Sequence, residues 1–280
     1  MKLSPSARIV MILFLSALAI RAQTEKAKLL PTESAARRVQ AIRTELDSQV
    51  GGDKFEAYKA QHEQLFNRWK QVVATFVMAQ LEAEPELDQW QLRDQLMRVL
   101  GIKRADMRDD FHETPLVFPS VRYPVKDPAV WAVVYEGDIY NGAGGARVVV
   151  ESYVVEKGKA RLAGRGGAEM NGYALRLGGG QIYNPNAGSV SVLTHATAQW
   201  SSGHVLPAAA ALYAVGPTGV KTLWKLTAPG IEFVGQVDSG FVIQYHDEDR
   251  HSANMPSSAI DLYMTDHETP RRIGHHFNGE

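Results

Sequence analysis

Residues 23–113 carry a hydrophobic pattern that is typical of helices. Apolar residues recur every three or four positions, as they do on one face of an α-helix. The spacing predicts three helices, over about 32–49, 53–84 and 86–100. Because Gly51 and Gly52 leave only a short connection between the first two, we expect an antiparallel helical hairpin or small bundle.

The second predicted helix has an unusually regular apolar seam. Its steps alternate between three and four residues, which is the heptad pattern of helices that pack side by side. Two interpretations follow: packing within the chain, which we favour because the neighbouring helices are close in sequence, and a coiled-coil arm. In the second case, helix 53–84 would bind a protein partner or self-associate. The seam consists of Phe55, Tyr58, His62, Leu65, Trp69, Val72 and Phe76.

Residues 114–280 carry the pattern of short strands separated by turns. Only three of the 24 glycines precede residue 114, and the second part is rich in Val and Tyr. This composition predicts an all-β region built as a meander, a sandwich or a partial propeller-like array. The candidate strands are 116–117, 130–135, 147–155, 161–163, 173–177, 190–194, 211–215, 222–226, 233–237, 241–245, 259–264 and 271–274.

A faint repeat runs through the β-rich part. Tyr153, Tyr213 and Tyr263 each precede a turn and a second strand, and they lie 60 and 50 residues apart. That spacing is close to one propeller blade. About three blades would be fewer than a closed ring needs. We therefore favour the alternative that any hairpin can place an aromatic residue on its first strand.

The first 22 residues have the composition of a signal peptide. Lys2 and Arg8 precede an apolar run from Ile9 to Ile20, and small residues offer a cleavage site after Ala22. The run is too short to cross a bilayer as a mature helix. We therefore expect three regions: a signal peptide over 1–22, a helical region over 23–113 and a β-rich domain over 114–280.

Composition narrows the class of protein further. The chain has no cysteine, so disulfide scaffolds, thiol catalysis and thiolate metal sites are excluded. The net charge of −1 argues against a dedicated nucleic-acid-binding protein. No second apolar run is long enough for a transmembrane segment after signal cleavage. These features predict an exported soluble protein, periplasmic or extracellular.

Histidines and carboxylates gather near the C-terminus, where they offer the one candidate metal site. His246, Asp249, His251 and His267 could hold zinc or calcium. Their spacing fits no known ligand motif, however, and His246 and His251 share no face of a helix or strand. We favour a polar loop and a solvated tail, and we expect no cofactor.

Glycine clusters at 141–145 and 164–167 could be phosphate-binding loops. Such loops need a strand before them and a helix after them, whereas strand-like sequence follows both clusters. We therefore expect hairpin turns at both places. Acyl-transfer motifs such as G-x-S-x-G are absent from the sequence.

Aromatic residues of the β-rich part could form a binding surface for a sugar or a peptide. The candidates are Trp131, Tyr140, Tyr183 and Trp200. Aromatic faces stack on apolar ligand surfaces, and their polar tips find partners in water. The alternative, which we favour, is that these side chains fill a core.

Together these patterns predict a segregated α+β protein, with a helical N-terminal part followed by an all-β part. No catalytic constellation stands out. We therefore expect an exported, non-catalytic binding or assembly module of the cell envelope. The alternative is a metal-dependent envelope hydrolase that uses the C-terminal His/Asp cluster.

Overall fold

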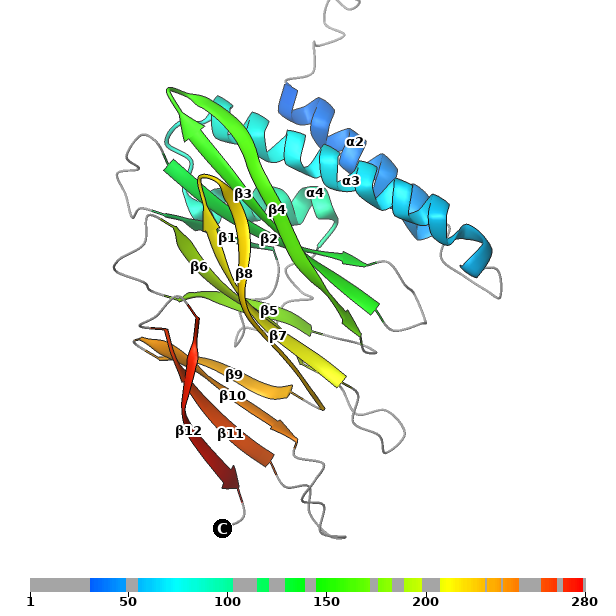
Figure 1. Ribbon diagram of the computed structural model, residues 1–280. Coiled ribbons are helices and arrows are strands. Elements are labelled where there is room, and N and C mark those ends of the chain that lie inside the picture. The colour runs from blue at the N-terminus through cyan, green and yellow to red at the C-terminus, as the bar shows by residue number, and fades with distance from the viewer. Residues whose placement is uncertain are drawn as a thin grey trace, which may run out of the picture.

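The computed structural model has a helical N-terminal part and a larger β part, which confirms the segregated α+β class (Figure 1). All structural statements below concern the described residues, which are 31–48, 55–102, 115–120, 129–138, 145–171, 176–182, 189–197, 207–229, 231–237, 239–246, 258–265 and 269–278. The predicted signal peptide and the Gly51-Gly52 connection lie outside them.

Three described helices match the three predicted ones closely. They are α2 (Pro31–Ser48), α3 (Phe55–Ala83) and α4 (Gln89–Leu100). The first two lie side by side and antiparallel (Figure 1), as expected of a hairpin. Asp88 caps α4, since its carboxylate accepts from the backbone N–H groups of Trp90 and Gln91, and Gly101 ends α4 in the left-handed conformation that glycine favours. Of the described helices, none has the length and apolar character needed to cross a membrane.

The apolar seam of α3 is covered by the protein itself. Leu65, Trp69 and Phe76 are buried in the core that α2, α4 and the first sheet share with α3. Phe66 and Val73, which lie beside the seam, are buried as well, so the covered stripe is wider than a coiled-coil contact. Packing within the chain, the favoured interpretation, therefore accounts for this part of the heptad pattern.

Twelve described strands form three antiparallel sheets, and each of the twelve predicted strands overlaps one of them. The first sheet contains β1 (Leu116–Pro119), β2 (Ala129–Asp138), β3 (Gly145–Glu156) and β4 (Lys159–Asn171). The second contains β5 (Arg176–Ile182), β6 (Val190–Thr197), β7 (Pro207–Gly216) and β8 (Gly219–Pro229). The third contains β9 (Ile231–Val237), β10 (Gly240–His246), β11 (Ser258–Met264) and β12 (Arg271–Asn278). Each sheet is a simple meander.

The three sheets and the helices stack as four layers (Figure 1). One hydrophobic core lies between the helices and the first sheet and includes Trp69 and Tyr135. A second core joins the first and second sheets, and a third joins the second and third sheets. Because side chains alternate between the faces of a strand, the first two sheets each contribute to two cores.

The three tyrosines of the sequence repeat occupy equivalent places. Tyr153, Tyr213 and Tyr263 each lie on the third strand of their sheet. In each case the pairing with the fourth strand shifts register at the tyrosine. A β-bulge at the same position in three successive meanders is more than a generic hairpin requires. The β part is therefore a stack of three related four-stranded units.

The glycine cluster at 164–167 lies within β4, so the predicted hairpin turn at this position is wrong; β3 and β4 are joined instead at Lys157 and Gly158. Gly164 and Gly166 serve packing against the second sheet, whereas the close contact of Gly167 is with the adjacent strand β3. A Cβ on Gly164 would lie 2.7 Å from the Cα of Gly219, at the start of β8. Residues 141–144 of the other cluster lie outside the described part of the chain.

Candidate functional site

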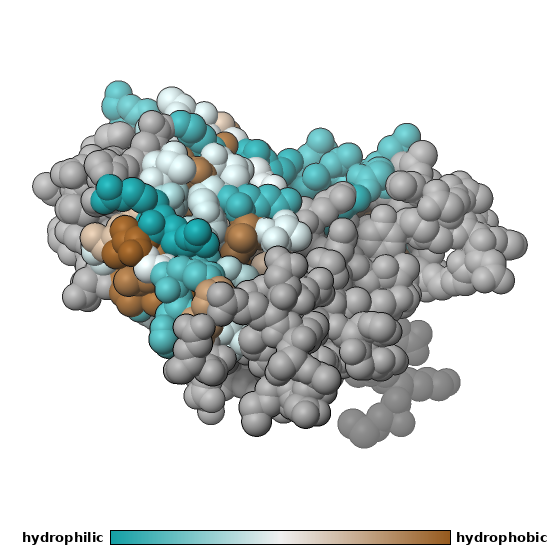
Figure 2. All heavy atoms as spheres, turned by 60° about the horizontal axis from the view of Figure 1, so that its bottom comes forward, coloured by the Kyte–Doolittle hydropathy of each residue, from teal (hydrophilic) through white to brown (hydrophobic). Residues whose placement is uncertain are grey.

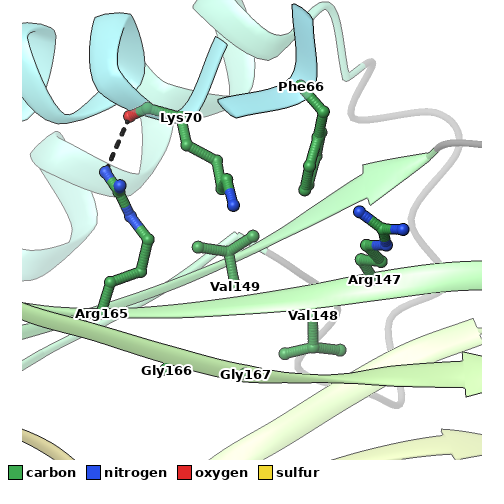
Figure 3. Close-up of a pocket in the computed structure, with 8 residues that line it drawn as sticks. All are labelled: Phe66, Lys70, Arg147, Val148, Val149, Arg165, Gly166 and Gly167. Carbon is green, nitrogen blue, oxygen red and sulfur yellow. Dashed lines mark hydrogen bonds between the residues drawn. The ribbon is translucent and has the colours of Figure 1, made fainter. Parts of the chain in front are cut away.

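A pocket of about 380 Å³ lies between α3 and the strands β3 and β4 (Figure 3). Helix α3 contributes Phe66 and Lys70, which are one turn apart and therefore on one face of the helix. The sheet contributes two arginines and a floor of small or apolar residues. The sheet residues that line the pocket are Arg147, Val148, Val149, Arg165, Gly166 and Gly167.

Three cationic side chains from three different elements meet in this pocket. Figure 3 shows Lys70 reaching from α3 toward Val149, with Arg165 on one side and Phe66 and Arg147 on the other. The Nζ atom of Lys70 lies 4.7 Å from the centroid of the Phe66 ring, and the guanidinium carbon of Arg147 lies 5.3 Å from it. Both distances are in the range of cation–π contacts, which hold the two cations beside the same ring.

The two arginines are fixed by hydrogen bonds. The Nε of Arg165 donates to Oε1 of Glu151 over 2.5 Å. The Nη2 of Arg165 donates to the backbone carbonyl of Lys70 over 3.1 Å. Arg147 forms an ion pair with Glu63 of α3. These contacts also tie the helix to the sheet, so the pocket walls are preorganised.

The electrostatics of the pocket favour an anion. Burial lowers the pKa of Lys70, and the positive charges of Arg165 and Arg147 lower it further. The carboxylates of Glu63 and Glu151 only partly offset this effect. Among the described residues, Lys70 and the two arginines therefore contribute three positive charges, and the two glutamates contribute two negative charges. An anionic ligand would relieve this repulsion and supply the missing negative charge.

Arg165 connects the pocket to a fully buried carboxylate, Glu151. It accepts a hydrogen bond from the hydroxyl of Tyr153 and forms the ion pair with Arg165. Burial raises the pKa of Glu151, while Arg165 and the Tyr153 hydroxyl act in the opposite direction. Burial, followed by the charge of Glu151, raises the pKa of Tyr135 and of Tyr153, so both phenols stay neutral at physiological pH.

The third sheet repeats this buried cluster. Asp261 is two residues before Tyr263, as Glu151 is before Tyr153, and it accepts from the hydroxyls of Tyr263 (3.2 Å) and Tyr245 (3.3 Å). His275 of β12 contacts Asp261 from the register position that Arg165 has opposite Glu151. The second sheet has Ala211 at the acidic position. Because the cluster occurs in both the first and the third sheet, we interpret it as a structural feature of these two four-stranded units.

The predicted metal site falls outside the side chains that the structure describes and stays a prediction. His246 ends β10, its side chain is not described, and Asp249, His251 and His267 lie outside the described residues. Within the described part of the chain, no group of three His, Asp or Glu side chains could hold a metal ion. His275, from the same region, instead pairs with Asp261, whose carboxylate already has three further donors within reach: Tyr245, Tyr263 and Arg272.

The predicted aromatic surface is not present at Trp131. Its side chain is 3% exposed and lies in the core between the helices and the first sheet. The favoured alternative, core filling, therefore holds for this residue, because it alternates with residues facing the second sheet. Tyr140, Tyr183 and Trp200 are outside the described residues.

Sequence reasoning missed the three cations of the pocket. Lys70 and Arg147 look like ordinary solvated charges, and nothing local shows that a helix and a strand 77 positions apart will meet. One signal was available for the buried framework: an acidic residue precedes both Tyr153 and Tyr263 by two positions, which places acid and tyrosine on one face of a strand.

The fold and the pocket together define a layered α+β protein with a cationic pocket at the joint between its helical and β parts. No family model, no curated protein and no solved structure matches the chain.

Proposed function

We propose that this protein is an exported, non-catalytic binding module of the cell envelope, periplasmic or extracellular, whose pocket takes an anionic group. The observation that carries the proposal is the excess of cationic side chains around Lys70, in a preformed pocket with an aromatic wall. Arginine and lysine together are the usual partners of phosphate and carboxylate groups in proteins.

The size of the pocket supports a small ligand or the anionic end of a larger one. A cavity of about 380 Å³ is near the lower end of the range for small-molecule sites. The ring of Phe66 would contact an apolar portion next to the anion. Binding is favoured over catalysis because each arginine is engaged with a carboxylate, and no nucleophile–base pair lines the pocket among the described residues.

A thermal-shift series tests this function directly. Inorganic phosphate, sulfate and acetate are added as sodium salts at constant ionic strength, with sodium chloride as reference. We expect phosphate or one of the other oxyanions to raise the melting temperature of the protein, because a ligand that binds only the native state stabilises it.

Two lysine variants show whether such an effect comes from the pocket. Lys70→Met removes the cation but keeps the apolar stem. Lys159→Met removes the same charge from β4 at a side chain that is 82% exposed. The ligand-dependent shift should disappear in the first variant and persist in the second. Equal shifts in both variants would refute the pocket as the binding site.

Export is tested separately from binding. We expect an antibody-detectable form that is shorter by about the predicted signal peptide in the envelope or external fraction of the producing cell. A full-length protein found only in the cytosol would contradict this part of the proposal without affecting the pocket.

A further inference from the structure

Glu63 is an acidic side chain beside the cationic pocket. It lies on α3 three positions before Phe66 and seven before Lys70, which places all three on one face of the helix. Its carboxylate forms the ion pair with Arg147. Its charge acts on the pKa of Lys70 in the direction opposite to that of the two arginines. The pocket therefore has a carboxylate next to two of the cations that would hold an anion.

The second carboxylate near the pocket, Glu151, has a different structural origin. It is fully buried and pairs with Arg165 of the same sheet. Asp261 contacts His275 at the equivalent register positions of the third sheet. The pair of Glu151 and Arg165 thus belongs to the four-stranded unit, whereas Glu63 comes from the helix that closes the pocket.

The charge balance of the pocket follows from these contacts. Arg165 and Glu151 together contribute no net charge. The remaining described groups that act on one another there are two cations, Lys70 and Arg147, and one carboxylate, Glu63. Their sum is one positive charge. A singly charged anion neutralises these groups, whereas a doubly charged anion adds an excess negative charge beside the carboxylate of Glu63.

Exposure decides how much such a charge balance matters. Arg272, the arginine that pairs with Asp261 in the third sheet, has a side chain that is 54% exposed. Figure 2 shows this end of the molecule, where hydrophilic residues lie beside apolar ones at the surface. The side chain of Arg147 is only 16% exposed. Because charges that are shielded from water interact more strongly, the carboxylate beside Arg147 has the larger effect on a ligand.

We infer that Glu63 determines the specificity of the pocket and restricts it to singly charged oxyanions, such as a carboxylate or a sulfonate, on an apolar group. This inference rests on the proposed function. Glu63 competes with the ligand for Arg147 and repels a second negative charge, while Lys70 attracts the first. Inorganic phosphate satisfies the same limit when it binds as the dihydrogen ion.

Isothermal titration calorimetry with two probes of equal shape tests this specificity. Slightly above neutral pH, benzenesulfonate carries one negative charge and phenylphosphonate carries two. We expect the wild type to bind the sulfonate more tightly. In Glu63→Gln, which keeps the shape of the side chain, the affinity should rise roughly tenfold for the phosphonate and roughly threefold for the sulfonate, because the electrostatic energy is proportional to the charge of the ligand.

Glu82→Gln is the matched control. Glu82 lies on the same helix as Glu63, roughly 28 Å farther along it. Its side chain has the same exposed fraction of 36%, and it also pairs with a cation of the first sheet, Lys159. We expect Glu82→Gln to keep the wild-type ratio of the two affinities, because its charge is far from the pocket.

The outcomes separate this inference from the proposed function. If the probes bind and Glu63→Gln leaves the ratio of their affinities unchanged, the inference is overturned while the anion site stands. A wild type that prefers the phosphonate overturns it as well, and so does an equal change of the ratio in Glu82→Gln. If neither probe binds to the wild type or to Glu63→Gln, the proposed function fails and the inference fails with it.

Discussion

Lys70 shows how a single residue acquires a role from its surroundings. Its stem follows α3, its Nζ lies against the ring of Phe66, and two arginines of the sheet approach it from either side. In an exposed position the same side chain would be an ordinary solvated charge. Burial, and after it the charges of Arg165 and Arg147, lower the pKa of Lys70.

The buried carboxylate of Glu151 should matter for stability more than Glu63, the partly exposed partner of Arg147. Glu151→Gln removes the charge that compensates Arg165, and breaking a buried ion pair typically costs about 3 kcal/mol or more. Glu63→Gln, at a side chain that is 36% exposed, should cost less than about 1 kcal/mol. Urea unfolding at pH 7 measures both, and equal losses would show that Glu151 does not hold Arg165 as a charged partner.

His195 predicts a specific pH dependence of stability. It lies in β6 between Gly178 and Ala210, and burial lowers its pKa to about 4. An unfolded histidine titrates near 6.5. Between these two values the unfolded chain binds a proton that the native protein does not, so the free energy of unfolding falls as the pH falls from about 6.5 to about 4.

The variant His195→Gln isolates this contribution. The pKa difference corresponds to about 3 kcal/mol, which the wild type should lose over this range and the variant should retain. Above about pH 6.5 the difference between the two proteins should be constant. Parallel curves from pH 4 to pH 8 would mean that His195 is protonated in the native protein, or solvated.

At the scale of elements, the periodicity of the sequence was sufficient to predict helices and strands. Each predicted helix has a described counterpart with bounds within a few residues, and each predicted strand overlaps a described one. The exception is the predicted turn at residues 164–167. The sequence from Gly164 to Gly167 has the composition of a turn, but β4 continues through it. Gly164 and Gly166 lie where the second sheet approaches too closely for a side chain.

Gly164→Ala tests that close approach. The added Cβ would lie 2.7 Å from the Cα of Gly219, which is backbone, so the first and second sheets would have to move apart. Overpacking of this kind costs roughly 1–3 kcal/mol. In Gly180→Ala the nearest atom would be 3.5 Å away, and we expect unchanged or slightly higher stability. Similar midpoints of thermal unfolding for the two variants would contradict the packing argument.

At the scale of the whole molecule, the repeat explains why the β part stacks and why its two ends differ. The helices close one end over Tyr135 and Tyr153, whereas the other end presents Leu262 and its neighbours. The tyrosine spacing indicated this repeat, but spacing alone could not distinguish it from three unrelated hairpins. The pairing shift at each tyrosine, which only the structure shows, makes the distinction.

The candidate site could not be predicted because it is assembled across elements. Arg147 and Arg165 lie on adjacent strands, and Lys70 comes from the helix that packs on them. Local patterns gave no reason to join these positions. These patterns indicated the C-terminal histidines instead. A cluster of residues along the sequence can be recognised without a structure, whereas a cluster in space cannot.

Isothermal titration calorimetry with inorganic phosphate at low ionic strength tests the central claim, an anion site at Lys70, most directly. Low salt is needed because screening weakens the attraction. We predict one phosphate bound per chain in the wild type and in Lys159→Met, and at least a tenfold weaker affinity in Lys70→Met. Wild-type and Lys70→Met proteins that bind phosphate equally, or not at all, would contradict it.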